Sequence, residues 1–174
     1  MKRFVILLFL FLIPSGLIPA VNQEYLVKAV FLEKFTNFVD WPKESSAYDS
    51  TKPFIIGIVG ENPFGKALAD VYAGQKIFNK RIEIRSILNI THCQDCQIIF
   101  IARSEKDDLP EIIKLIKDKP ILTVSDTEGF AKQGVMINLY IEENTIKFEV
   151  NEPAVRQSPL KVSHLLLNMA RIVK

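Results

Sequence analysis

The most suggestive chemical motif is a pair of cysteines, Cys93 and Cys96, which stand three positions apart directly after His92. A catalytic dithiol needs its first cysteine at a helix N-terminus after a strand, whereas this pair comes before a strand. A haem-attachment motif has its histidine after the second cysteine, and a zinc site needs more ligands than the distant His164 supplies. Because an even cysteine count in an exported protein favours pairing, we predict a Cys93–Cys96 disulfide, structural or redox-sensing. Redox catalysis, metal binding and free thiols are the alternatives.

A second candidate motif is GENPFGKA at residues 60–67, which follows an apolar run and precedes a helical pattern as a phosphate-binding loop does. Ala67 takes the place of the Ser or Thr whose hydroxyl would hold magnesium, and Pro63 removes one backbone N–H donor. We therefore interpret the segment as a turn in which Phe64 packs into the core.

The remaining polar residues form no catalytic grouping. His164 lies in a leucine-rich segment, and Asp126 and Glu128 suit a turn or a helix cap. The sequence therefore predicts no catalytic residue, no metal and no cofactor. We expect a binding protein and not an enzyme.

The elements that position these residues alternate between strand and helix. Apolar residues recur three and four positions apart from Tyr25 to Val39, which predicts a helix that Trp41 and Pro42 end. The other predicted elements are strands at 54–59, 82–87, 97–102 and 120–125, helices at 63–72 and 109–117, a hairpin of strands at 135–141 and 145–150, and a closing helix at 162–173. This order predicts a single-domain α/β sandwich: a mostly parallel sheet with an antiparallel C-terminal hairpin and helices on both faces.

The N-terminus has the layout of a secretory signal peptide. Lys2 and Arg3 precede an unbroken apolar run from Phe4 to Ile13, and Ala20 offers a small residue for cleavage. We predict that residues 1–20 are removed, that residues 21–174 form one domain, and that the mature protein is soluble and periplasmic. The segment holds two of the 22 Lys and Arg residues and none of the 20 Asp and Glu residues, so the mature chain is formally neutral. Neutrality argues against a nucleic-acid partner.

Seven short stretches carry a further signal through their order along the chain. They are KAVFLEKFTNFVDWP (28–42), CQIIFI (96–101), ILTVSD (121–126), GFA (129–131), VMI (135–137), IKFEVN (146–151) and LKVS (160–163). Together they resemble the YfiR-like family of periplasmic regulators over nearly all of the mature chain.

This resemblance implies an α/β sandwich that often self-associates, so a homodimer is one expected assembly. It also implies a protein that restrains an inner-membrane diguanylate cyclase from the periplasmic side, which lowers cyclic di-GMP and biofilm formation. An outer-membrane lipoprotein that sequesters the regulator is a further implied partner. A small-ligand-binding module, a redox sensor and a thiol oxidoreductase that uses Cys93 and Cys96 are the alternative functions.

Two sets of residues are candidates for the binding surface. Partner binding requires exposed apolar or aromatic area, and the opening helix has more aromatic side chains than one face needs. These candidates are Tyr25, Phe31, Phe35, Phe38 and Trp41. The carboxyl ends of parallel strands usually present the ligand crevice of an α/β sheet. The candidates there, for a ligand or a partner, are Asn62, Phe64, Asp126 and Phe130.

Overall fold

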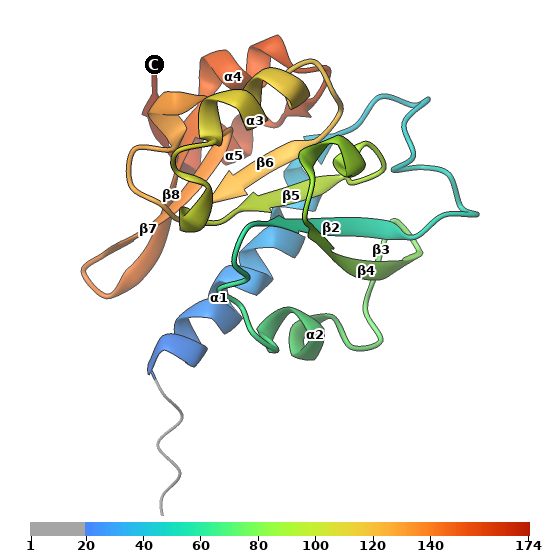
Figure 1. Ribbon diagram of the computed structural model, residues 1–174, viewed down its shortest axis with the longest axis horizontal. Coiled ribbons are helices and arrows are strands. Elements are labelled where there is room, and N and C mark those ends of the chain that lie inside the picture. The colour runs from blue at the N-terminus through green and yellow to red at the C-terminus, as the bar shows by residue number, and fades with distance from the viewer. Residues whose placement is uncertain (1–19) are drawn as a thin grey trace, which may run out of the picture.

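An eight-stranded sheet organises the fold (Figure 1). The computed structural model describes residues 20–174, and the predicted signal peptide therefore lies almost wholly outside the described residues. The strands of the sheet are β2 (Phe54–Val59), β3 (Lys76–Ile77), β4 (Lys80–Ile87), β5 (Ile98–Ile101), β6 (Leu122–Ser125), β7 (Ile137–Glu142), β8 (Thr145–Asn151) and β10 (Arg171–Val173). Their spatial order is β10-β8-β7-β6-β5-β2-β4-β3. The five strands from β4 to β7 run parallel, while β3 and β8 pair antiparallel with β4 and β7. The predicted α/β class and mostly parallel sheet are confirmed.

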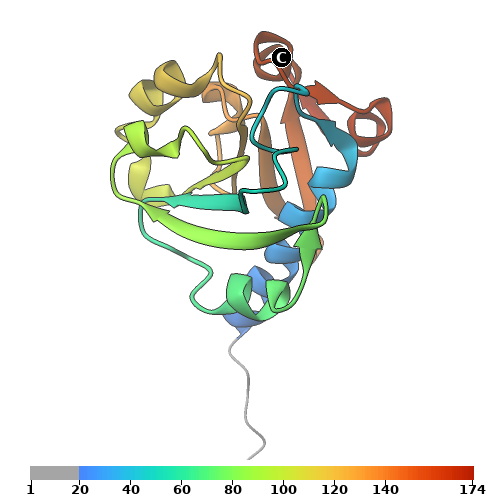
Figure 2. The same cartoon turned by 90° about the vertical axis from the view of Figure 1, so that its right-hand side faces the viewer.

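The helices lie on both sides of this sheet (Figure 2). They are α1 (Ala20–Phe35), α2 (Ala67–Tyr72), α3 (Leu109–Ile116), α4 (Glu152–Gln157) and α5 (His164–Met169), with short 3-10 turns η1 (Thr36–Phe38), η2 (Ile90–Cys93), η3 (Arg103–Glu105) and η4 (Ala131–Gln133). A two-stranded ribbon pairs β1 (Val39–Asp40) with β9 (Lys161–Val162). Within residues 20–174, no helix has the length and apolar character needed to cross a bilayer.

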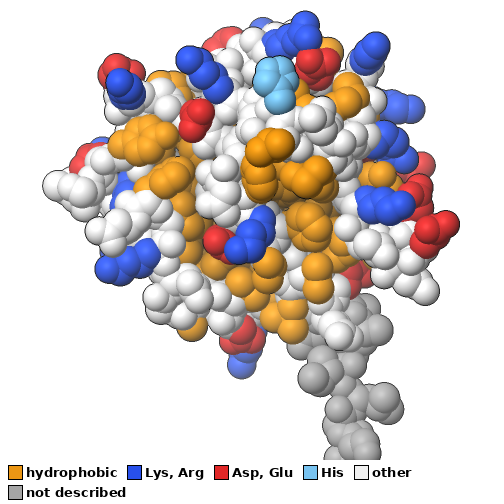
Figure 3. All heavy atoms as spheres, turned by 180° about the vertical axis from the view of Figure 1, so that it is seen from behind, with side chains coloured by type: hydrophobic (Ala, Val, Ile, Leu, Met, Phe, Trp, Pro, Cys, Tyr) orange, Lys and Arg blue, Asp and Glu red, His pale blue; other side chains and the backbone are white. Residues whose placement is uncertain are grey.

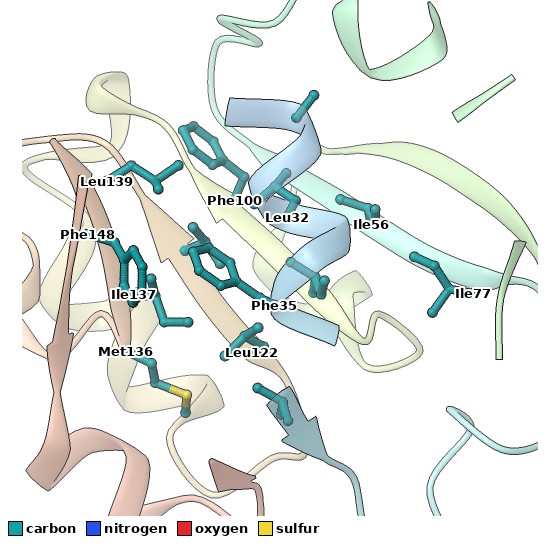
Figure 4. Packing of buried hydrophobic residues seen from close by; sticks show 14 of the residues in the cluster. Leu32, Phe35, Ile56, Ile77, Phe100, Leu122, Met136, Ile137, Leu139 and Phe148 are labelled. Atoms are coloured by element: carbon teal, nitrogen blue, oxygen red, sulfur yellow. The ribbon is translucent and has the colours of Figure 1, made fainter. Parts of the chain in front are cut away.

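Two hydrophobic cores sandwich the central strands, because successive side chains of a strand point to opposite faces. Ile56 and Ile58 of β2 belong to the core beneath α1 and α2. Ile55 and Val59 of the same strand belong to the core beneath α3. On the α1 side, Leu32 and Phe35 of the helix lie among strand residues that include Phe100, Leu122, Ile137 and Phe148 (Figure 4). The sheet is therefore apolar on both faces where a helix covers it.

The C-terminal hairpin forms as predicted, with β7 antiparallel to β8. Glu143 and Asn144 connect the strands with φ of 51° and 57°. Two consecutive residues at positive φ define a type I′ turn, whose twist matches that of the flanking strands.

The predicted closing helix over 162–173 is wrong. Ser163 starts α5 by accepting a hydrogen bond from the Leu165 backbone N–H, but the helix ends at Met169 and Ala170 is extended. Arg171–Val173 then pairs with β8 as strand β10. As a strand, this segment pairs with backbone groups at the edge of β8, and the Arg171 guanidinium binds Glu149 at 2.6 Å.

Two other predicted helices are shorter than expected. The opening helix gives way to η1 and then to β1, whose pairing with β9 occupies Val39. Helix α2 begins at Ala67 and not at Pro63. The Asn62 side chain accepts from the Phe64 N–H and Gly65 has φ +54°, so these residues form a turn. The interpretation of GENPFGKA as a turn with a buried Phe64 is confirmed.

Candidate functional site

The five aromatic residues proposed as a partner surface divide between core and surface. Phe35 and Trp41 are buried, and Trp41 packs edge-on against Phe54. Tyr25, Phe31 and Phe38 are partly buried and pack against the core below α1. Only these last three have area left for a partner.

The four candidate loop residues at the strand ends also differ in burial. Phe64 and Phe130 are buried in opposite cores, and Asn62 is exposed. Phe64 and Asp126 meet through Tyr25. The rings of Tyr25 and Phe64 are edge-to-face at 5.2 Å, and the Tyr25 hydroxyl donates to Asp126 Oδ2 at 2.9 Å. The structure thus brings one helix residue and two loop residues together at the carboxyl edge of the sheet.

A buried ion pair completes this cluster. Lys28 Nζ lies 2.6 Å from Asp126 Oδ2, with the two side chains 5% and 9% exposed, and also pairs with Glu24. The ammonium stands 4.4 Å from the centre of the Tyr25 ring. Burial first, and then the Asp126 carboxylate, raise the pKa of Tyr25, so its hydroxyl remains a neutral donor. The sequence analysis missed Lys28. The only signal in the sequence was the spacing of Glu24 and Lys28, four positions apart on one helix face.

A hollow of about 380 Å³ adjoins the ion pair between α1, the end of β6 and the β7–β8 hairpin. We call it the corner pocket. Asn138 is 1% exposed and donates to Glu149 Oε1 at 3.3 Å, while its Oδ1 has no partner among the described residues. Arg171 binds Glu149 and lies 4.1 Å from the Tyr140 ring. The corner pocket therefore presents both charge signs and one unsatisfied buried acceptor, which suits binding of a polar group.

The two cysteines are free thiols in this structure, and both are buried. The predicted disulfide stays a prediction. Cys93 lies at the end of η2 and not at a helix start. Burial raises the pKa of both thiols, for Cys96 to about 12, which is the opposite of what activates a nucleophilic cysteine. Gly57 on β2 allows the Cys96 side chain to pack closely against the strand, since a Cβ at position 57 would stand 3.0 Å from Cys96 Sγ.

Within residues 20–174, no group of three or more His, Cys, Asp or Glu side chains could hold a metal ion.

An exposed apolar surface lies on the α1 side of the sheet, where hydrophobic side chains gather near the middle of the face (Figure 3). On α5, Leu165 and Met169 are 65% and 58% exposed, while Leu166 between them is buried in the core. On α1, Val27 and Val30 are also exposed. We call Leu165 and Met169 of α5 the rear apolar surface. Sequence reasoning missed it because it placed Leu165–Leu167 within one long helix.

Breaking the Lys28–Asp126 pair is expected to destabilise the fold. Lys28→Met leaves the Asp126 carboxylate buried with Tyr25 as its remaining partner, so the free energy of unfolding should fall by about 3–5 kcal/mol. The matched control is Lys52→Met, which breaks the exposed pair with Asp49 and should cost less than about 1 kcal/mol. Urea denaturation measures both. Equal losses in the two variants would contradict a structural role for the buried pair.

The buried thiols predict a pH dependence of stability. The raised pKa of Cys96 means that the folded state favours the neutral thiol, so burial of the thiol contributes its full free energy of stabilisation below pH 9, the ordinary pKa of a thiol. This stabilisation is lost as the pH rises toward 12, the pKa of Cys96 in the folded protein, at up to about 1.4 kcal/mol per pH unit for each thiol. Urea denaturation under reductant, between about pH 8 and about pH 10, should show this fall.

The matched control is the Cys93→Ala/Cys96→Ala variant, which should show a flatter pH profile. The same slope in both proteins would contradict the assignment to the thiols. A sample prepared without reductant that contains no reactive thiol after unfolding would establish the predicted disulfide.

Comparisons with known proteins agree with this architecture. A family model described as YfiR/HmsC-like matches residues 25–171. None of the curated proteins matches the sequence. Among solved structures, a conserved domain protein from Vibrio cholerae O1 biovar El Tor str. N16961 is similar with a TM-score of 0.56 at 10% identity. The alignment covers 86% of this chain but 60% of that one, and at this identity the likeness shows the fold alone.

The family match spans all seven stretches on which the sequence resemblance rested, and it covers most of the described residues. The chain therefore belongs to the YfiR/HmsC-like family, whose role is regulatory and periplasmic.

Proposed function

We propose that this protein is an exported, non-enzymatic regulator that binds the periplasmic part of an inner-membrane diguanylate cyclase and restrains it. Lower cyclic di-GMP would then limit biofilm formation. The proposal includes removal of residues 1–20 as a signal peptide and maturation of residues 21–174 as one domain. An outer-membrane lipoprotein that sequesters the regulator, and a homodimer, belong to the same proposal.

The observation that carries the proposal is the rear apolar surface. Leu165 and Met169 lie one helical turn apart on α5, and each residue is more than half exposed. A buried Leu166 anchors the same short helix to the core. Large apolar side chains that are held rigidly and left in water are typical of protein–protein contact sites, where their burial supplies the binding energy.

Two further observations support a binding role over catalysis. Family membership favours regulation over catalysis and an interaction with a membrane signalling protein in general. The raised thiol pKa values also disfavour the thiol oxidoreductase alternative, because a thiolate is the reactive form. The choice of a diguanylate cyclase as the target rests on the resemblance to the YfiR-like regulators.

Deletion of the gene in its native host, followed by measurement of cyclic di-GMP, tests the proposal. The level should rise, and the full-length gene should restore it. A gene that lacks residues 1–20 should fail to restore it, because the product stays in the cytoplasm. Leu165→Ser/Met169→Ser should restore it only partly, since the substitutions remove the two exposed large apolar side chains of α5.

The matched control for the α5 variant is Tyr48→Ser, which changes an exposed aromatic residue outside the rear apolar surface and should restore the level fully. Melting temperature and periplasmic abundance must equal those of the unaltered protein. An unchanged cyclic di-GMP level after deletion would rule out a cyclase as the target.

A further inference from the structure

A second hollow, of about 760 Å³, lies between the ends of β2 and β4 and helix α3. The chain leaves β2 toward α2 on one face of the sheet, and it leaves the neighbouring strand β5 toward α3 on the other face. Such a reversal opens a crevice at the carboxyl ends of the strands, which is where α/β sheets usually bind their ligands. We call this hollow the switch groove.

The base of the switch groove is apolar. Val59, Ile87 and Ile112 line it and are each at most 4% exposed. Two more apolar residues line it from the surface, since Leu88 is 99% exposed and Leu115 is 41% exposed. The apolar lining therefore continues from the buried base to side chains that stand free in water, and a ligand longer than the hollow could bury them.

Every charged residue that lines the groove is acidic. They are Glu61, Glu105, Asp108 and Glu111, and no Lys, Arg or His lines it. Within residues 20–174, none of these four carboxylates takes part in an ion pair at 4 Å or less. A favourable interaction with the α3 dipole accounts for Asp108 and Glu111, which flank the start of that helix. It does not account for Glu61, which follows β2, or for Glu105, which precedes α3 by a turn.

We propose that the switch groove binds a peptide segment of a partner protein in which Lys or Arg alternates with aliphatic residues. The aliphatic side chains would cover Leu88 and Leu115, and the cations would meet the four carboxylates. Charges of opposite sign around an apolar groove attract the peptide and fix how its residues align along the groove. The acidic lining excludes a phosphate or nucleic-acid ligand, and the described residues offer no metal-binding group.

This inference rests on the proposed function as a binding protein and adds the chemistry of one partner segment. The switch groove lies at the strand ends, whereas the rear apolar surface lies on α5. The two sites can therefore be tested separately.

The probe is an acetylated peptide of alternating leucine and lysine, titrated into the ¹⁵N-labelled protein and followed by amide chemical shifts. We expect the shifts to cluster at the backbone of Leu88, Glu105 and Leu115, and the affinity to fall as salt is raised. Glu61→Gln/Glu111→Gln should weaken the affinity by about threefold or more, since two of the four charges are lost. The matched control is Glu44→Gln/Asp70→Asn, which removes two exposed carboxylates outside the groove and should leave the affinity unchanged.

Shifts scattered over the surface, equal binding of a leucine–glutamate peptide, or an unaltered affinity in the Glu61→Gln/Glu111→Gln variant would each overturn the inference. So would self-association of the protein that Leu88→Asp abolishes, because the occupant would then be a second copy of the chain. Since the titration uses the purified protein alone, its failure would leave the cyclic di-GMP test of the proposed function intact.

Discussion

The rest of the structure depends on the burial of a sheet whose central strands are apolar on both faces. Every residue of β2, β5 and β6 is buried, so neither face can be left to water. Helix α1 covers one face with Leu32 and Phe35, and α3 covers the other with Ile112 and Ile116. This demand fixes where the opening helix lies. Its outer side, with Val27 and Val30, is left exposed as a consequence.

The candidate binding sites lie where the helices no longer cover the sheet. Beyond the end of β6, the β7–β8 hairpin projects past the parallel strands, and polar residues such as Asn138 and Glu149 replace the apolar ones on its α3-side face. The Lys28–Asp126 pair closes the same corner by tying α1 to the loop after β6. Further along the same carboxyl edge of the sheet, the divergence of α2 and α3 leaves the switch groove. The fold thus concentrates its polar and exposed features at the strand ends and on α5.

Much of the fold could be predicted from the sequence. The six-residue run Phe54–Val59 has no polar residue, which marks a strand buried on both sides, and Asn144 is a residue type that tolerates the positive φ of a tight hairpin. The C-terminal segment could not be predicted, because Arg171–Val173 has a helical apolar pattern and becomes a strand only through the free edge of β8. Lys28 was missed because its partner is 98 residues away. Phe35 and Trp41 appeared to be surplus aromatic area, but both fill space that the sequence alone does not reveal.

The central claim, that a periplasmic regulator binds a membrane protein through α5, is tested most directly by crosslinking in living cells. A photoreactive amino acid would replace Leu165, and in a control it would replace Glu143 at the exposed tip of the hairpin. The account predicts an ultraviolet-dependent adduct between the exported protein and an inner-membrane diguanylate cyclase from position 165 only. No membrane-protein adduct from position 165 in a folded and exported protein, or the same adduct from both positions, would contradict it.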